Sequence, residues 1–135
     1  MKRFYKGSRM IKPLKMKYLH EVLGLKKNDT VMVTGAGGKT SFCLALCEEL
    51  KEHNRIIFTT TTKIFFPEVR KNYKIYTGND FLHKNLTENG TYITGKEENE
   101  QGKLLPFSLD ENDNFKEKAD YHIIEGDGNR MKHLK

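Results

Sequence analysis

The stretch Val-Met-Val-Thr-Gly-Ala-Gly-Gly-Lys-Thr-Ser at residues 31–41 decides the fold, because it joins an apolar run to a glycine cluster and then to a helical pattern. The apolar run at residues 31–33 predicts a buried strand, and the pattern after Lys39 predicts a helix as far as about His53. Backbone N–H groups point outward at a helix N-terminus, and the helix dipole favours negative charge there. The order of strand, glycine loop and helix therefore predicts a site for a phosphate-sized anion.

The loop carries side chains of the types that commonly bind nucleotide phosphates. Lys39 can reach terminal phosphates and act on them catalytically, and Thr40 can offer its hydroxyl to Mg²⁺. The loop is shorter than the pattern G-x-x-x-x-G-K-[ST], since Val33 stands where that pattern has its first glycine. It is similar to the compact loop of Mur-type amide ligases, and a glycine-rich turn without a ligand is the alternative interpretation. The expected phosphate-binding residues are Gly35, Ala36, Gly37, Gly38, Lys39, Thr40 and Ser41.

The composition is that of a rather polar protein of one domain. The chain has 135 residues, of which 36% are hydrophobic and 31% are charged, so it can bury one core. No stretch approaches the roughly 20 apolar residues of a membrane span, and the basic N-terminus lacks the apolar segment of a secretory signal. We therefore expect a cytoplasmic protein with no membrane partner.

The cysteines and histidines show no metal-ligand spacing. Cys43 and Cys47 lie four residues apart on one face of the predicted helix, and the chain has no further cysteine to complete a zinc site. We expect both to be reduced core residues, and His122 to be a packed histidine of a strand.

The positive net charge of +6 comes from the N-terminus. Seven of the 24 Lys and Arg residues fall within residues 1–17, which contain no acid. We expect residues 1–15 to form a basic flexible arm and residues 16–135 to form the nucleotide-binding domain. Such an arm could touch nucleic acid, but the chain has no RNA-binding signature, so a solvated leader is the preferred interpretation.

The apolar runs predict an α/β fold with a mostly parallel sheet flanked by helices. A second strand at residues 55–59 follows the helix, and this strand–helix–strand unit predicts two parallel strands with a right-handed crossover. Shorter strands are expected at residues 74–77 and 91–94, and a last buried strand at residues 120–125. The polar, acid-rich residues 95–114 are expected to form an exposed excursion.

Three polar clusters follow three of the predicted strands: the glycine loop, residues 59–63 and residues 125–132. Ligands of open parallel sheets collect outside the carboxyl ends of the strands, so we expect the three clusters to share one site. In the second cluster, Thr61, Thr62 and Lys63 can hold phosphate oxygens or the water shell of a metal. The preference of threonine for strands is the alternative explanation of this run.

Two carboxylates of the third cluster suit Mg²⁺. Glu125 ends a hydrophobic run, and Asp127 follows it between two glycines. With the hydroxyl of Thr40 they make the oxygen-rich set that Mg²⁺ prefers. Asp127 is also expected to position or deprotonate a nucleophile. A plain turn is the alternative, since Gly-Asp-Gly-Asn is strong turn composition.

The three clusters resemble the three blocks of the YqeC-like proteins, which are bacterial accessory proteins associated with selenium-dependent molybdenum hydroxylases. The matching blocks are residues 35–41, 59–64 and 125–132. The third block of that family usually reads E-A-D-G-S-R and then P-L-K; here Gly126 replaces the alanine and Asn129 the serine. Asn129 can still form hydrogen bonds but is no nucleophile, so no chemistry is assigned to it.

The resemblance implies a P-loop-like domain that acts in the maturation of a selenium-dependent molybdenum hydroxylase. The implied partners are Mg²⁺, a nucleoside triphosphate such as ATP or GTP, and a molybdenum hydroxylase or a selenium or molybdenum cofactor intermediate. The activity we expect is nucleotide hydrolysis or nucleotidyl or phosphoryl transfer; a non-catalytic nucleotide-binding adaptor and a fragment of a Mur-type ligase are the alternatives. The resemblance covers about residues 16–135. Because family members continue beyond it, we expect a sheet that is incomplete at its C-terminus.

Overall fold

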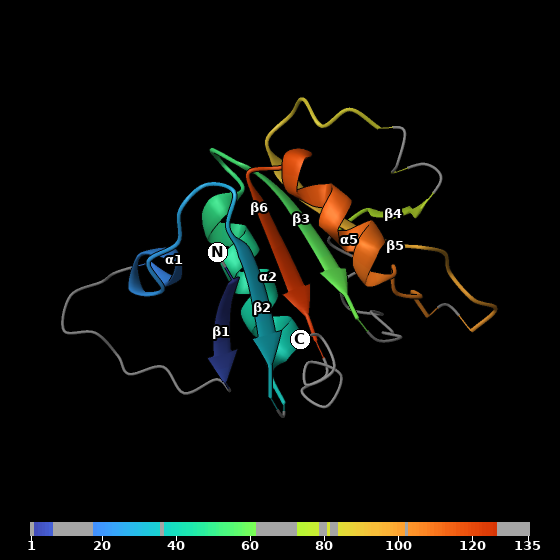
Figure 1. Ribbon diagram of the computed structural model, residues 1–135, viewed down its shortest axis with the longest axis horizontal. Coiled ribbons are helices and arrows are strands. Elements are labelled where there is room, and N and C mark those ends of the chain that lie inside the picture. The colour runs from blue at the N-terminus through green and yellow to red at the C-terminus, as the bar shows by residue number, and fades with distance from the viewer. Residues whose placement is uncertain are drawn as a thin grey trace.

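A parallel six-stranded sheet forms the centre of the computed structural model (Figure 1). The structure describes residues 2–6 (backbone only), 18–35, 37–61, 73–78, 81, 84–101 and 103–126. The strands are β1 (Lys2–Lys6), β2 (Thr30–Thr34), β3 (Arg55–Thr60), β4 (Ile75–Thr77), β5 (Gly90–Gly95) and β6 (Tyr121–Glu125). The helices are α1 (Leu19–Val22), α2 (Lys39–Leu50), α5 (Leu109–Asp113) and the 3-10 helix η1 (Asn114–Glu117). The sheet order is β1-β2-β6-β3-β5-β4, and each of these strand pairs is parallel, which confirms the α/β class.

Strand β6 lies between the two strands of the predicted strand–helix–strand unit. It pairs with β2 on one side, where Val33 is opposite Glu125, and with β3 on the other, where Thr60 is opposite Glu125. Strands β2 and β3 are therefore parallel, as predicted, but they are not neighbours. All residues of β6 are buried, as expected for a central parallel strand that is covered on both faces.

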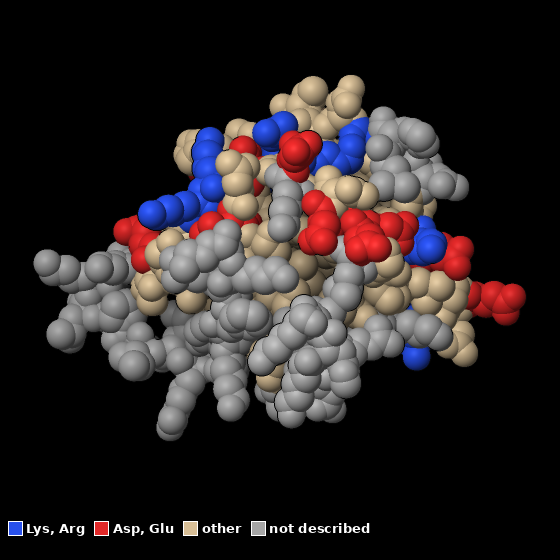
Figure 2. Space-filling model, in the orientation of Figure 1, with Lys and Arg blue, Asp and Glu red and all other residues tan. Residues whose placement is uncertain are grey.

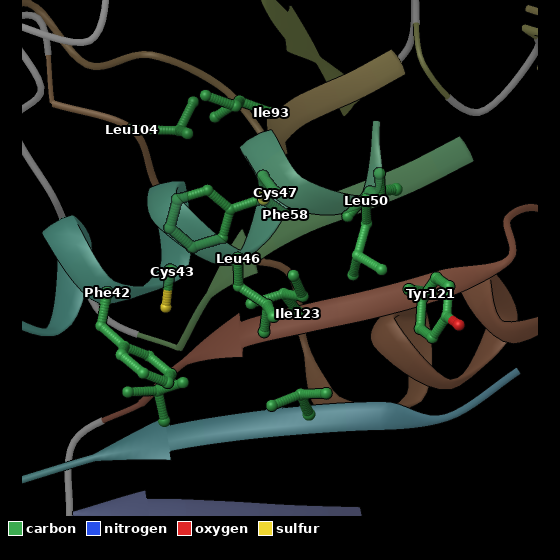
Figure 3. Packing of buried hydrophobic residues seen from close by; sticks show 13 residues of the cluster. Phe42, Cys43, Leu46, Cys47, Leu50, Phe58, Ile93, Leu104, Tyr121 and Ile123 are labelled. Atoms are coloured by element: carbon green, nitrogen blue, oxygen red, sulfur yellow. The ribbon is translucent and has the colours of Figure 1, made fainter. Parts of the chain in front are cut away.

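Helix α2 covers one face of the sheet (Figure 1). Its apolar residues alternate with exposed ones at helical spacing, and the buried ones are Phe42, Cys43, Leu46, Cys47 and Leu50. They pack against one side of the central strands, including Ile123 of β6 and Phe58 of β3 (Figure 3). This contact fixes the start of α2, and with it the glycine loop, above the carboxyl ends of the strands.

Helices α5 and η1 cover the opposite face, where the sequence predicted an exposed excursion (Figure 1). Most described residues of this segment are exposed as expected, including residues 96–98, 100, 101 and 103. Leu104 and Phe107, which form an apolar break in its sequence, are buried, and the ring of Phe107 meets that of Phe115 edge to face at 5.0 Å. A capping box starts α5: the Ser108 side chain accepts from the N–H of Glu111, and the Glu111 side chain accepts from the N–H of Ser108. The result is a sheet with a helical layer on each side.

The N-terminal strand β1 differs from the expected flexible arm. Residues 2–6 pair in parallel with β2, with Lys2 opposite Thr30 and Lys6 opposite Thr34. This pairing satisfies backbone groups of β2 that a sheet edge would leave open. Residues 7–15 of the expected arm lie outside the described part of the chain.

None of the helices in the described residues is long and apolar enough to cross a membrane. The α2 helix has 12 residues, against the roughly 20 that a membrane span needs.

Candidate functional site

The carboxyl ends of β2, β6 and β3 meet at one edge of the sheet (Figure 1). Backbone hydrogen bonds continue the ladder past the strands: the N–H of Gly126 donates to the carbonyl of Val33 at 2.8 Å, and the N–H of Thr61 donates to the carbonyl of Glu125 at 3.0 Å. The segments that follow the three strands are therefore held side by side. The described residues of the three polar clusters that lie at this end of the sheet include residues of the glycine loop, Thr61 and Glu125.

The glycine loop uses backbone conformations that other residues rarely adopt. Gly35, Gly37 and Gly38 have φ angles of 118°, 71° and 69°, in the region that favours glycine. Gly38 is the N-cap of α2 and has no side chain to cap the helix. A Cβ atom built on Gly37 would meet nothing within 4 Å, so the space in front of this glycine is open. The first N–H groups of α2 are thus left without a capping side chain next to open space.

Two side chains of the first turn of α2 reach across to the end of β6. Lys39 Nζ donates to the carbonyl oxygen of Gly126 at 3.1 Å. The hydroxyl of Thr40 donates to Oε1 of Glu125 at 2.5 Å. Glu125 is 7% exposed, so its carboxylate sits in a largely buried place with a hydroxyl in contact. A cation, a hydroxyl and a carboxylate from two distant parts of the sequence therefore meet at the strand ends.

Cys43 lies directly beneath this group. Its side chain extends from α2 toward the end of β6 (Figure 3). Burial raises the pKa of the Cys43 thiol, the negative charge of Glu125 raises it further, and the charge of Lys39 opposes the shift. Burial likewise raises the pKa of Cys47 to about 12. Both cysteines are free and buried, which confirms the prediction of reduced core residues.

A buried polar network supports the site from the α5 side. The Thr59 hydroxyl lies 2.8 Å from Oδ1 of Asn112 and 2.8 Å from Nε2 of His122, and all three residues are buried. The amide of Asn112 also donates to the carbonyl of Ser108 at 3.0 Å. Sequence reasoning anticipated the packed His122 but missed Asn112. The capping box that starts at Ser108 was the signal that could have placed Asn112 on a helix.

Some of the predicted site residues lie at the strand ends, and others fall outside the residues that the structure describes. Those that it brings to the strand ends are Gly35, Gly37, Gly38, Lys39, Thr40, Ser41, Thr61 and Glu125. Ser41 is exposed on the first turn of α2, and Thr61 is buried beside β6. Those outside the described residues are Ala36, Thr62, Lys63 and Asp127. Within the described residues, no group of three His, Cys, Asp or Glu side chains could hold a metal ion.

Comparison with known proteins identifies the family. Residues 31–135 match the sequence model of the family described as YqeC protein. The chain belongs to the YqeC family. It is also 33% identical over 120 residues to a protein of Escherichia coli (strain K12) described as uncharacterized protein YqeC. This match covers 84% of the chain and 46% of that relative, so the chain spans about half the length of the curated relative. No solved structure matches this YqeC family member.

Proposed function

We propose that this member of the YqeC family binds the phosphates of a nucleoside triphosphate, together with Mg²⁺, at the ends of β2, β6 and β3. The observation that carries the proposal is the convergence of Lys39 and Thr40 on the end of β6, beside a loop in which Gly37 faces open space. An ammonium group, a hydroxyl and outward N–H groups at the start of a helix are the groups that phosphate binding uses.

Lys39 and the loop would hold the phosphate oxygens. The lysine ammonium now donates to a neutral carbonyl, that of Gly126. A charged phosphate oxygen is a stronger acceptor than a carbonyl, so a bound nucleotide can take over this contact. The N-terminal dipole of α2 adds to the attraction, since Lys39 is the first residue of this 12-residue helix.

The oxygen atoms of Thr40 and Glu125 fit Mg²⁺. They meet at the strand ends, where the hydroxyl donates to the carboxylate, and oxygen donors are those that Mg²⁺ prefers. Asp127 follows Glu125 by two residues and is the further ligand we expect. When bound, Mg²⁺ would neutralise charge on the phosphates, and Glu125 would keep the cation next to the lysine that holds their oxygens.

The reaction we propose is hydrolysis of the nucleotide or transfer of its phosphoryl or nucleotidyl group. Carboxylates beside a phosphate site can orient or deprotonate an attacking group, and Asp127 is the candidate for this role. The cellular role we propose is maturation of a selenium-dependent molybdenum hydroxylase; the family resemblance is its support. A nucleotide-binding adaptor without catalysis is the second candidate, because the contacts of Lys39 and Thr40 at the strand ends suit phosphate binding whether or not a reaction follows.

A panel of nucleoside triphosphates, titrated with and without Mg²⁺, tests the proposal. Binding is read by calorimetry and product by release of phosphate or pyrophosphate. The Lys39→Ala variant is expected to lose about ten- to a hundredfold in affinity, because a hydrogen bond to a charged group is removed. Lys51→Ala is the matched control, since Lys51 lies just past the other end of α2 and pairs with Glu48. Equal affinity of wild type and Lys39→Ala would reject the site, and binding without product would select the adaptor.

A further inference from the structure

The backbone of Gly126, the residue that follows β6, is held from two sides. Its N–H donates to the carbonyl of Val33 in β2 at 2.8 Å, and its own carbonyl accepts from Nζ of Lys39 in α2 at 3.1 Å. Gly126 is buried, and buried backbone groups are nearly always hydrogen-bonded. The first of these bonds continues the ladder of the sheet, whereas the second comes from a side chain. Only the contact from Lys39 can therefore change without moving a strand.

The ammonium group of Lys39 can serve either this carbonyl or a phosphate group. Lys39 is half-buried and is the first residue of α2, so it lies beside the N–H groups that the glycine N-cap leaves without a side-chain partner. A carbonyl is a neutral acceptor, and a hydrogen bond between an ammonium group and a phosphate oxygen is roughly twice as strong. A phosphate group at the start of α2 would therefore draw the ammonium group away from Gly126.

A second tie between α2 and β6 does not depend on the lysine. The hydroxyl of Thr40 donates to Oε1 of Glu125 at 2.5 Å, one residue before Gly126. The carbonyl of Glu125 also accepts from the N–H of Thr61 at 3.0 Å. These bonds hold the last residue of β6 when the carbonyl of Gly126 is released. The change is therefore confined to the peptide group to which this carbonyl belongs.

A carbonyl released by Lys39 has to find another donor, because a buried polar group without a partner is costly. On the face shown in Figure 2, the Lys and Arg side chains of the described residues lie mainly along the upper edge, near the amino ends of the strands. Strand β6 ends at the lower side of the same view (Figure 1), so these side chains are remote from the carbonyl of Gly126. The peptide group then has to turn, and glycine permits the turn because it lacks a Cβ atom.

We propose that the contact between Lys39 and Gly126 is an autoinhibitory latch, which a bound phosphate group opens. This latch rests on the phosphate site proposed above and adds its regulation, because the protein itself holds the lysine until a phosphate group competes for it. Opening turns the carbonyl of Gly126 away from α2. Gly126 directly precedes Asp127, the carboxylate that we expect to act on the nucleotide. Filling of the phosphate site is thereby communicated to the third polar cluster.

Carbonyl ¹³C signals of the labelled full chain test the latch, because the signal of a carbonyl carbon moves when the carbonyl loses a hydrogen bond. Lys39→Met removes the ammonium group and keeps most of the apolar stem. Without nucleotide, we expect the Gly126 carbonyl signal of this variant to move from its wild-type position. ATP with Mg²⁺ is expected to move the wild-type signal in the same direction and to leave the signal of the variant nearly unchanged.

Lys51→Met is the matched control, since Lys51 lies just past the other end of α2 and pairs with Glu48. This variant should keep the Gly126 carbonyl signal at its wild-type position and respond to ATP as the wild type does. The N–H of Gly126 controls for fraying of the strand end, because it donates to Val33 and not to the lysine. Its protection from hydrogen exchange should persist in Lys39→Met. Loss of this protection would mean that the strand end unfolds, and would overturn the latch.

Calorimetry on the same samples separates the latch from the phosphate site. If ATP binds the wild type and the Gly126 carbonyl signal does not move, Lys39 holds the carbonyl and the phosphate together through its several N–H groups. The latch is then overturned while the phosphate site stands. If Lys39→Met leaves the signal at its wild-type position, the contact is not formed in solution and the latch is likewise overturned. If no nucleoside triphosphate of the panel binds the wild type, the phosphate site is rejected, and the latch with it.

Discussion

Thr40 and Glu125 lie 85 residues apart in the chain and share a hydrogen bond of 2.5 Å. The bond exists because β6 is inserted beside β2, which brings the end of the last described strand to the first turn of α2. The same insertion brings the carbonyl of Gly126 to the ammonium group of Lys39. The sheet order, more than the glycine loop alone, makes this edge a candidate site.

Glu125→Gln tests the role of charge at this bond. Glutamine can still accept from Thr40, so the local structure is expected to persist while the negative charge is lost. We expect Mg²⁺ to strengthen nucleotide binding in the wild type and to have about tenfold less effect in the variant, since charged oxygens are the stronger ligands. Calorimetric titrations with and without Mg²⁺ measure this. The exposed change Glu117→Gln serves as control, and an unchanged Mg²⁺ effect in Glu125→Gln would exclude Glu125 as a ligand.

Asn112→Ala tests the network that ties α5 to the sheet. The variant leaves the buried hydroxyl of Thr59 without its bond to Oδ1 and removes the link from Asn112 to the carbonyl of Ser108. We expect a loss of about 1–3 kcal/mol in the free energy of unfolding, the cost of unsatisfied buried polar groups. Urea unfolding measures it, with Glu117→Ala, an exposed change on η1, as the reference. A loss no larger than that of Glu117→Ala would mean that the network does not stabilise the fold.

The two thiols should resist alkylation in the folded protein. Burial raises the pKa of Cys47 from an ordinary 9.0 to about 12, and burial together with the charge of Glu125 raises the pKa of Cys43. Each pKa unit lowers the thiolate fraction about tenfold at pH 8, and the thiolate is the reactive form. Labelling by iodoacetamide should therefore be orders of magnitude slower in the folded chain than in urea. Comparable rates in the two states would show that the thiols are not buried as described.

Asp120 should make the fold sensitive to acid. Burial raises the pKa of this carboxyl, but hydrogen bonds from the N–H and guanidinium of Arg55 outweigh burial, so its pKa is lowered overall. A carboxyl whose pKa is lower in the folded than in the unfolded chain stabilises the fold above the unfolded value of about 4, and that stability is lost as pH falls through the folded value.

Asp120→Asn is expected to be less stable than the wild type at pH 7 and to lose less stability between about pH 5 and pH 2, because the proton-linked part is gone. Urea unfolding at a series of pH values gives both curves. Two parallel curves would mean that Asp120 does not contribute to the acid sensitivity. The N–H of Ser108 also lowers the pKa of Glu111, which adds an effect of the same sign in both proteins.

The central strands and the glycine loop could be predicted from the sequence because their signals are local. Residues 31–33 are an apolar run, and Tyr121, Ile123 and Ile124 are the apolar residues of the last strand; a polar cluster follows each. The helix after Lys39 has helical spacing of its apolar residues. Because the strands are parallel, the polar segments that follow β2, β3 and β6 lie at the same end of the sheet. The strand order could not be predicted in this way, because it depends on contacts between segments that are distant in the sequence. These contacts place β6 between β2 and β3.

Two elements were missed for physical reasons. Helix α5 has the sequence Leu-Asp-Glu-Asn-Asp, in which the buried side chain of Asn112 faces a polar network, so no hydrophobic pattern marks it. Only the capping box at Ser108 and Glu111 signals a helix there. Strand β1 forms by pairing with the backbone of β2, which lies far from it in the sequence. Its short basic sequence has no apolar alternation that would predict a strand.

The proposed phosphate site is tested most directly by locating the nucleotide on the protein through NMR amide shifts during titration with ATP and Mg²⁺. We expect the largest changes at Gly37, Gly38, Lys39 and Thr40, with smaller ones at Thr61 and Gly126, and little change around Asn54 at the other end of the sheet. Saturating shifts that appear elsewhere and leave the start of α2 unchanged, or no shifts with any nucleoside triphosphate, would contradict it.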